Sequence, residues 1–125
     1  MTEPSKTEII RKLFDAYRTK TRAVVEDLLA DDFTFTSPYD DRIGKAAYFE
    51  RCWPASLAYI RSNELEQICE AGDTAFVLYK CVTVDGREFR NTEHFAFASG
   101  TVKAINVYFG ATYKDGVFLA QQPDA

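Results

Sequence analysis

The feature that most constrains the fold is a change in the spacing of the hydrophobic residues near residue 32. Before this point, apolar residues recur every three or four positions, as on one face of an amphipathic helix. From Phe33 to Ser37 they alternate with hydroxyl-bearing residues, as along a strand with one buried face. The pattern therefore predicts N-terminal helices followed by strands.

The N-terminal segment carries the signals of a capped helix. Ser5 and Glu8 stand three residues apart, as in a capping box, and a periodic apolar stripe follows them. This predicts a first helix over residues 5–19. A second, shorter apolar pattern predicts another helix, which gives way to a strand near Asp32.

Proline marks the next two boundaries. The strand should end at Ser37, because Pro38 has no N–H to donate to a neighbouring strand. The aspartates at 40–41 then predict a polar loop. A broad apolar face over residues 47–60 predicts a third helix, with a kink or a break at Pro54.

The second half of the chain predicts four consecutive strands from Ser62 onward. Glycine-containing turn signals separate them at residues 71–73, 85–86 and 98–100. Helices followed by a run of antiparallel strands indicate an α+β fold. The last residues, 121–125, are expected to fray.

Length and charge narrow the possible functions. A chain of 125 residues supports one hydrophobic core, so we expect a single domain covering residues 1–125. The net charge is −4 and the 15 Lys and Arg are dispersed, so a nucleic-acid partner is not expected. Neither a membrane-spanning run nor a signal-peptide pattern is present, so we expect a cytoplasmic protein with no membrane partner.

Cysteine and histidine usage argues against a metal. The three cysteines, Cys52, Cys69 and Cys81, form an odd set without close pairs, which favours reduced thiols over a disulfide framework. The single histidine, His94, cannot complete a His/Cys cluster of zinc spacing. We therefore expect no metal and no cofactor.

One predicted strand places a carboxyl group among aromatic rings. Aromatic residues make up 14% of the chain, a large share that suggests a lined pocket. A period of two places five residues on one face of this strand: Phe89, Asn91, Glu93, Phe95 and Phe97. In the last strand the corresponding apolar face holds Ile105, Val107 and Phe109. Glu93 thus stands out as the candidate functional group.

Two interpretations of Glu93 remain open. A charge on an apolar face must find a partner, become neutral through a raised pKa, or face a wet cavity. If a β-bulge shifts the register, Glu93 could instead pair with Arg90 at the sheet edge.

Three further side chains have a functional and a structural interpretation. Tyr17 lies on the apolar stripe of the first helix, where its hydroxyl could enter the same space or reach the surface. Trp53 could form a pocket wall or fill the core. His94 falls on the outer face, where a surface or interface role is expected rather than catalysis.

The sequence resembles the SnoaL-like and ketosteroid-isomerase-like branch of the nuclear transport factor 2-like superfamily over nearly its whole length. Four segments carry the resemblance: LADDFTFTSP at 29–38, GKAAYF at 44–49, EHFAF at 93–97 and VKAINVYFG at 102–110. The resemblance implies a cone in which N-terminal helices pack on a curved, mostly antiparallel sheet and enclose a pocket. It also implies a homodimer packed through the outer faces of the sheets.

Ketosteroid isomerase uses one aspartate as the base, and a tyrosine together with a protonated aspartate binds the oxyanion. Glu93 falls where the resemblance places the protonated aspartate. Ser37 falls at the position of the aspartate base. Its hydroxyl stays protonated near neutral pH, so it cannot accept a proton as a carboxylate does. Leu13 falls at the tyrosine, with Tyr17 one turn later. Steroid isomerisation by that mechanism is therefore not expected.

The resulting hypothesis is an acid–base enzyme of isomerase, cyclase or hydrolase type, acting on a small apolar carbonyl or epoxide compound. Glu93 would donate a proton or hydrogen bond, Tyr17 would assist, and Asp40 would act as the base unless it is a solvated turn residue. The alternative is a non-catalytic module for hydrophobic-ligand binding or dimerisation. The expected ligand-binding residues are Ser37, Tyr39, Trp53, Asn91, Phe95, Val107 and Phe109.

Overall fold

The first helix has the expected boundaries. A computed structural model describes residues 5–120, and in it α1 (Lys6–Thr19) begins after Ser5, whose side chain accepts a hydrogen bond from the backbone N–H of Glu8. The N-cap interaction is therefore confirmed. The helix ends at Lys20, which takes the left-handed conformation and donates its N–H to carbonyls of the last turn. The expected fraying of residues 121–125 lies outside the described residues.

The first strand begins earlier than expected and has an additional neighbour. α2 (Arg22–Leu28) leads directly into β1 (Leu29–Ser37). The expected loop at residues 40–41 is wrong, because β2 (Asp40–Gly44) folds back and pairs antiparallel with β1. Its polar composition hid this strand: β2 is at the edge of the sheet, where most of its side chains face solvent and only Ile43 packs against the core.

The expected third helix is broken, as its proline predicted. α3 (Lys45–Arg51) and α4 (Trp53–Tyr59) meet at Cys52, whose N–H still bonds to the carbonyl of Tyr48 at 2.8 Å. Pro54 stands in the first turn of α4, where its missing N–H costs nothing. None of the helices in residues 5–120 is long and apolar enough to cross a membrane.

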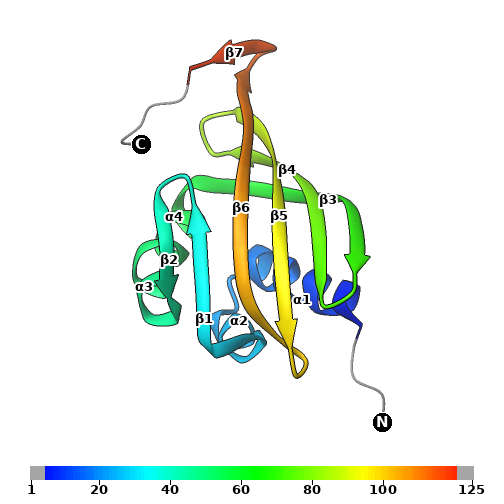
Figure 1. Cartoon of the computed structure of the whole chain (residues 1–125). Coiled ribbons are helices and arrows are strands. Elements are labelled where there is room, and N and C mark those ends of the chain that lie inside the picture. Colours follow the sequence, from blue (N-terminus) through cyan, green and yellow to red (C-terminus); the bar gives the residue numbers. More distant parts are fainter. Residues whose placement is uncertain (1–4, 121–125) are drawn as a thin grey trace.

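The remaining strands complete one curved, mostly antiparallel sheet. The four expected strands are confirmed as β3 (Ile60–Ala71), β4 (Thr74–Thr83), β5 (Arg87–Ala98) and β6 (Thr101–Lys114). A short β7 (Val117–Leu119), which was not expected, folds back and pairs antiparallel with the end of β6. The order across the sheet is β2-β1-β6-β5-β4-β3, and β1 runs parallel to β6 while the other pairs are antiparallel. Figure 1 shows the helices gathered on one side of the long strands.

A glycine accompanies an irregularity between β5 and β6. The register of the two strands shifts between Phe89 and Asn91. Opposite this point, a Cβ at Gly110 would lie 2.1 Å from the carbonyl oxygen of Arg90. Any larger residue would clash with the main chain there, so Gly110 permits the close approach of the two strands. Such bulges increase the bend of a sheet.

The core fills the space between the helices and the inner face of the sheet. Ile10, Leu13 and Val25 from the helices are almost fully buried, as are Val77 and Phe95 from the strands. The outer face is less covered: Phe76 is 46% exposed and Tyr108 60% exposed. We call Phe76, Leu78, His94, Asn106 and Tyr108 the outer-face patch.

Candidate active site

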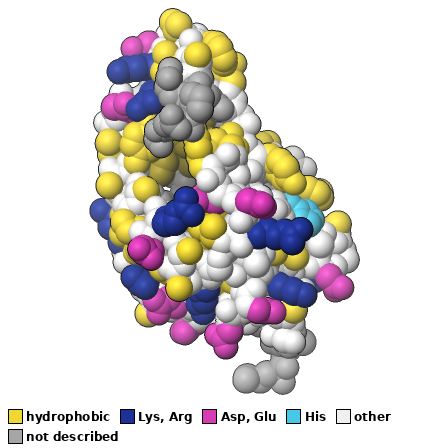
Figure 2. All heavy atoms as spheres, turned by 60° about the vertical axis from the view of Figure 1, so that its left-hand side comes forward, with side chains coloured by type: hydrophobic (Ala, Val, Ile, Leu, Met, Phe, Trp, Pro, Cys, Tyr) yellow, Lys and Arg dark blue, Asp and Glu magenta, His cyan; other side chains and the backbone are white. Residues whose placement is uncertain are grey.

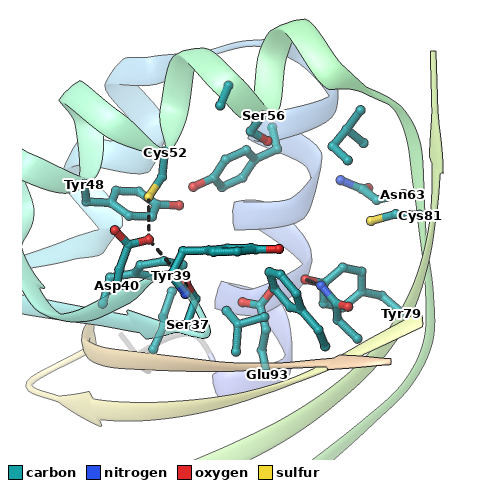
Figure 3. Close-up of a pocket in the computed structure, with 18 of the residues that line it drawn as sticks. Ser37, Tyr39, Asp40, Tyr48, Cys52, Ser56, Asn63, Tyr79, Cys81 and Glu93 are labelled. Atoms are coloured by element: carbon teal, nitrogen blue, oxygen red, sulfur yellow. Dashed lines mark hydrogen bonds between the residues drawn. The ribbon is translucent and has the colours of Figure 1, made fainter. Parts of the chain in front are cut away.

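A cavity of about 420 Å³ lies between the helices and the sheet. Much of its wall is aromatic, with rings from α1 and α3, from β1 and from the inner face of β4 and β5: Phe14, Tyr17, Phe35, Tyr48, Tyr79 and Phe89. Figure 3 shows Cys52 and Ser56 above it, on the helices, and Glu93 rising from the strands below. This size and apolar lining suit one small organic molecule.

Glu93 faces this cavity from β5. Its cross-strand neighbours are Val77 on β4 and Val107 on β6. The side chain is half-buried and lines the cavity. Burial away from water raises the pKa of Glu93 to about 7, although a hydrogen bond from Tyr79 favours the charged form. Near neutral pH the carboxyl is therefore present in both its protonated and ionised forms.

The alternative pairing of Glu93 with Arg90 does not occur. Arg90 lies on the opposite face of β5 and binds Glu66 with two hydrogen bonds, of 2.7 and 3.1 Å. Strand alternation thus holds from Asn91 to Phe95 despite the bulge next to Phe89. No ion pair in the described part of the chain involves Glu93.

Tyr79 and Asn91 form a hydrogen-bonded pair beside Glu93. The amide Nδ2 of Asn91 donates to the hydroxyl of Tyr79 at 3.0 Å, and both side chains are buried. Burial is the main reason that the pKa of Tyr79 lies well above its usual value, and the nearby Glu93 raises it further. Sequence reasoning did not identify Tyr79. The signal was present in β4, where Ala75, Val77, Tyr79 and Cys81 alternate as a buried set that includes one hydroxyl.

Tyr17 also contributes to the cavity wall. Its ring packs against Trp53 with centroids 5.0 Å apart. The hydroxyl oxygen is buried and has no hydrogen-bond partner within residues 5–120. The interpretation in which this hydroxyl reaches the surface is therefore wrong.

Asp40 is held at another part of the wall, not in solvent. Its side chain is 9% exposed and forms an ion pair with Arg51, whose Nη2 lies 2.8 Å from Oδ1. The hydroxyl of Ser37 donates to Oδ2 at 3.2 Å, and the thiol of Cys52 lies 3.8 Å from the same oxygen. Burial, and then the charge of Asp40, raises the pKa of Cys52 to about 11, so this thiol stays protonated. The interpretation of Asp40 as a solvated turn residue is wrong, because β2 turns its side chain inward.

Five of the seven expected ligand-binding residues line the cavity: Ser37, Tyr39, Asn91, Val107 and Phe109. Tyr39 and Phe109 are both partly exposed and their rings lie 5.6 Å apart, which places them at the mouth. Figure 2 shows a hollow in the surface with hydrophobic side chains on both sides of it and a Lys or Arg side chain below it.

The other two expected residues need correction. Trp53 and Phe95 are not part of the cavity wall; both belong to the core. Trp53 lies behind Tyr17 and Phe49, and Phe95 is fully buried next to Phe97. Period two predicts the face of a strand correctly, but it does not predict which part of that face the helices cover. In the described residues, no three His, Cys, Asp or Glu side chains come together as a metal site would require.

Comparison with known proteins agrees with this architecture. Similar solved structures include an NTF2-like protein of unknown function from Cytophaga hutchinsonii, 17% identical, covering 86% of this chain and 92% of that chain, with a TM-score of 0.72. A protein from Sinorhizobium meliloti is named provisionally as a polyketide cyclase. It is 21% identical, the match covers 80% of this chain and 93% of that chain, and the TM-score is 0.68.

A third similar structure, from Kribbella flavida, is named provisionally as a ketosteroid isomerase. It is 20% identical, covers 85% of this chain and 78% of that chain, and has a TM-score of 0.70. None of the curated proteins matches the sequence. The SnoaL-like domain family matches over residues 10–105. That match spans well over half of the sequence, and the chain therefore belongs to the SnoaL-like domain family, with an NTF2-like fold.

Proposed function

We propose that the cavity binds a small, mainly apolar carbonyl compound and acts on it by acid–base chemistry. The observation that carries this proposal is the environment of Glu93. Its carboxyl borders the cavity, has no cation paired with it in residues 5–120, and has a pKa of about 7. A protonated carboxyl in such a site donates a strong hydrogen bond to a carbonyl oxygen.

The proposed reaction divides the acid and base roles between two carboxyl groups. Glu93 donates to the carbonyl oxygen and stabilises the negative charge that develops there. The Tyr17 hydroxyl, which has no partner among the described residues, is available as a second donor. Asp40, at the Arg51 and Ser37 side of the cavity, accepts a proton from the carbon next to the carbonyl. An epoxide oxygen could replace the carbonyl in the same position.

The names of the similar structures support a reaction of this class. One is named as a polyketide cyclase and another as a ketosteroid isomerase, both of them enzymes named for carbonyl compounds. Ser37 occupies the position at which the isomerase resemblance requires a base. The proposal therefore places the base at Asp40 and does not include steroid isomerisation by the isomerase mechanism.

Two measurements test the proposal. First, a set of apolar ketones is screened for compounds that raise the melting temperature of the chain, as a ligand of the native state does. Second, exchange of the hydrogens next to the carbonyl for deuterium is followed by NMR. We expect Asp40→Asn to abolish exchange and to keep binding, whereas Asp41→Asn, at an exposed position on the same strand, should leave exchange unchanged. If no ketone raises the melting temperature, the proposal is wrong.

The alternative is a binding protein without catalysis, and one observation favours it. Both oxygens of Asp40 already interact with neighbouring side chains, with Arg51 at one and Ser37 at the other, so neither oxygen is free to face a substrate without giving up a contact. A ketone that binds without any exchange in the unmodified protein would support this alternative over the enzyme.

A further inference from the structure

The cavity wall contains hydrogen-bonding atoms that the protein does not satisfy. Oδ1 of Asn91 and the hydroxyl oxygen of Tyr17 are buried without a partner in the described residues. The Asn91 side chain belongs to a residue only 5% exposed. Leaving such an atom unpaired is unfavourable, because the atom loses its hydrogen bonds to water and gains none in the protein. Because Asn91 lines the cavity, a bound molecule is the natural partner of its Oδ1.

The neighbouring tyrosine determines which end of the Asn91 amide is free. The amide Nδ2 of Asn91 donates to the hydroxyl oxygen of Tyr79 at 3.0 Å, so the N–H end of the amide points to Tyr79 and Oδ1 stays free. A carbonyl oxygen accepts and does not donate. A partner for Oδ1 must therefore be a donor, an O–H or N–H group, which a molecule bound in the cavity can supply.

The free acceptor lies close to the proposed donor. Asn91 and Glu93 are two positions apart on the same face of β5, so their Cα atoms are about 7 Å apart. Two hydrogen bonds of about 3 Å each can then converge from these side chains on adjacent atoms of one ligand group. Tyr79 contacts both residues and holds them in this arrangement.

We propose that the cavity selects carbonyl compounds that carry an O–H or N–H group one or two bonds from the carbonyl carbon. The carbonyl oxygen accepts from Glu93, and the neighbouring O–H or N–H donates to Oδ1 of Asn91. α-Hydroxyketones, enols of 1,2-diketones and lactams meet this requirement, whereas simple ketones and esters leave Asn91 unpaired. This inference rests on the proposed function, because it names the ligand class of the same site.

Three probes of nearly the same shape separate the two requirements. 2-Quinolone has a carbonyl with an adjacent N–H, coumarin has a ring oxygen in place of that N–H, and naphthalene has neither. Each is titrated into the full chain at pH 6 by calorimetry. We expect 2-quinolone to bind at least tenfold more tightly than coumarin, because a buried hydrogen bond of about 1.4 kcal/mol corresponds to a factor of ten.

Two controls assign the preference to Asn91. Asn91→Leu should bind both probes with similar affinity. If that variant does not fold, N-methyl-2-quinolone replaces it, and this probe should bind the unmodified protein at least tenfold more weakly than 2-quinolone. Equal binding of 2-quinolone and coumarin would overturn the inference and leave the proposed carbonyl site standing, provided that both bind more tightly than naphthalene. If none of the three binds, both the inference and the proposed function are wrong.

Discussion

Asn91 and Tyr79 face each other across β4 and β5, and the amide of Asn91 donates to the Tyr79 hydroxyl at 3.0 Å. Tyr17, in the wall of the same cavity, has a hydroxyl with no such partner among the described residues. The two tyrosines therefore contribute to stability in opposite ways. Removing each hydroxyl in turn should show which of them stabilises the folded protein and which is available to bind a ligand.

Tyr79→Phe should destabilise the protein by about 1–3 kcal/mol. The substitution leaves Nδ2 of Asn91 buried without an acceptor, and an unsatisfied buried donor carries this cost. Denaturant unfolding followed by far-UV circular dichroism measures the change. A variant as stable as the unmodified protein would mean that Asn91 has found another acceptor.

Tyr17→Phe should leave stability unchanged or raise it by about 1 kcal/mol, because the lost hydroxyl had no partner in the described structure. Binding of a ketone that raises the melting temperature should weaken about tenfold if the hydroxyl donates to it. The two readouts come from the same thermal-shift titration. A clear loss of stability would show that this hydroxyl is bonded within the folded protein.

Glu93→Gln should change how stability depends on pH. With a folded pKa of about 7 against a usual 4.5, the folded state retains its proton over a range in which the unfolded state loses it. This contribution is therefore complete below pH 4.5, falls as pH rises towards 7 and is absent above it. A shift of this size corresponds to about 3 kcal/mol. The Gln variant should lose this slope and be the more stable protein at pH 8.

The control for this measurement is Glu88→Gln, at an exposed position on the same strand. It should keep the slope between pH 4.5 and 7 that the unmodified protein shows. NMR of the side-chain carboxyl carbon gives the pKa of Glu93 directly. A value at or below the usual range would contradict both the slope and the role of Glu93 as a donor.

Trp53→Ala should destabilise the fold by about 3–5 kcal/mol, the usual cost of deleting a large buried aromatic side chain. Trp53 lies in the core behind Tyr17, so its loss should affect stability first and ligand contacts only indirectly. Its indole fluorescence is a convenient probe, because Trp53 is the only tryptophan in the sequence. Unchanged stability in chemical denaturation would show that this position is not part of the core.

We propose that two copies of the chain associate through the outer-face patch. Phe76 packs against His94 at 4.7 Å between ring centroids, and the neighbouring Tyr108 is largely exposed, so the patch joins aromatic and polar groups as interfaces do. Sedimentation should give a dimer at micromolar concentration. Tyr108→Glu should dissociate it, whereas Lys12→Glu on α1 should not. A monomeric unmodified protein would contradict the proposal.

Sequence periodicity predicted the residues whose environment depends on one strand or one helix. The alternation around Glu93 and a helix break close to Pro54 follow from the local sequence alone, and both are confirmed, with the break at Cys52. The position of Asp40 could not be predicted in this way. It depends on β2 pairing with β1 and on Arg51, which approaches from α3.

The same limit explains the remaining differences. Tyr79 was not identified because its role depends on a cross-strand partner, Asn91, rather than on its own neighbours in the sequence. Trp53 and Phe95 cannot be distinguished from cavity-wall residues in the sequence, because an apolar inward-facing position looks the same whether packed side chains or empty space lie opposite it. Pairing between segments that are distant in the sequence therefore determines which residues form most of the candidate site.

The parallel pairing of β1 with β6 has a consequence for how the protein folds. Phe35 lies beside Ile105, seventy positions later in the chain, and this pairing joins the segment that carries Asp40 to the sheet that carries Glu93. Contacts of such long sequence separation form slowly, because a large loop must close before they stabilise anything. The hairpins of β3 to β6 can form without the first strand, but the complete cavity cannot. Ligand binding during refolding should therefore develop no earlier than the pairing of β1 with β6, and so report the last stage of assembly.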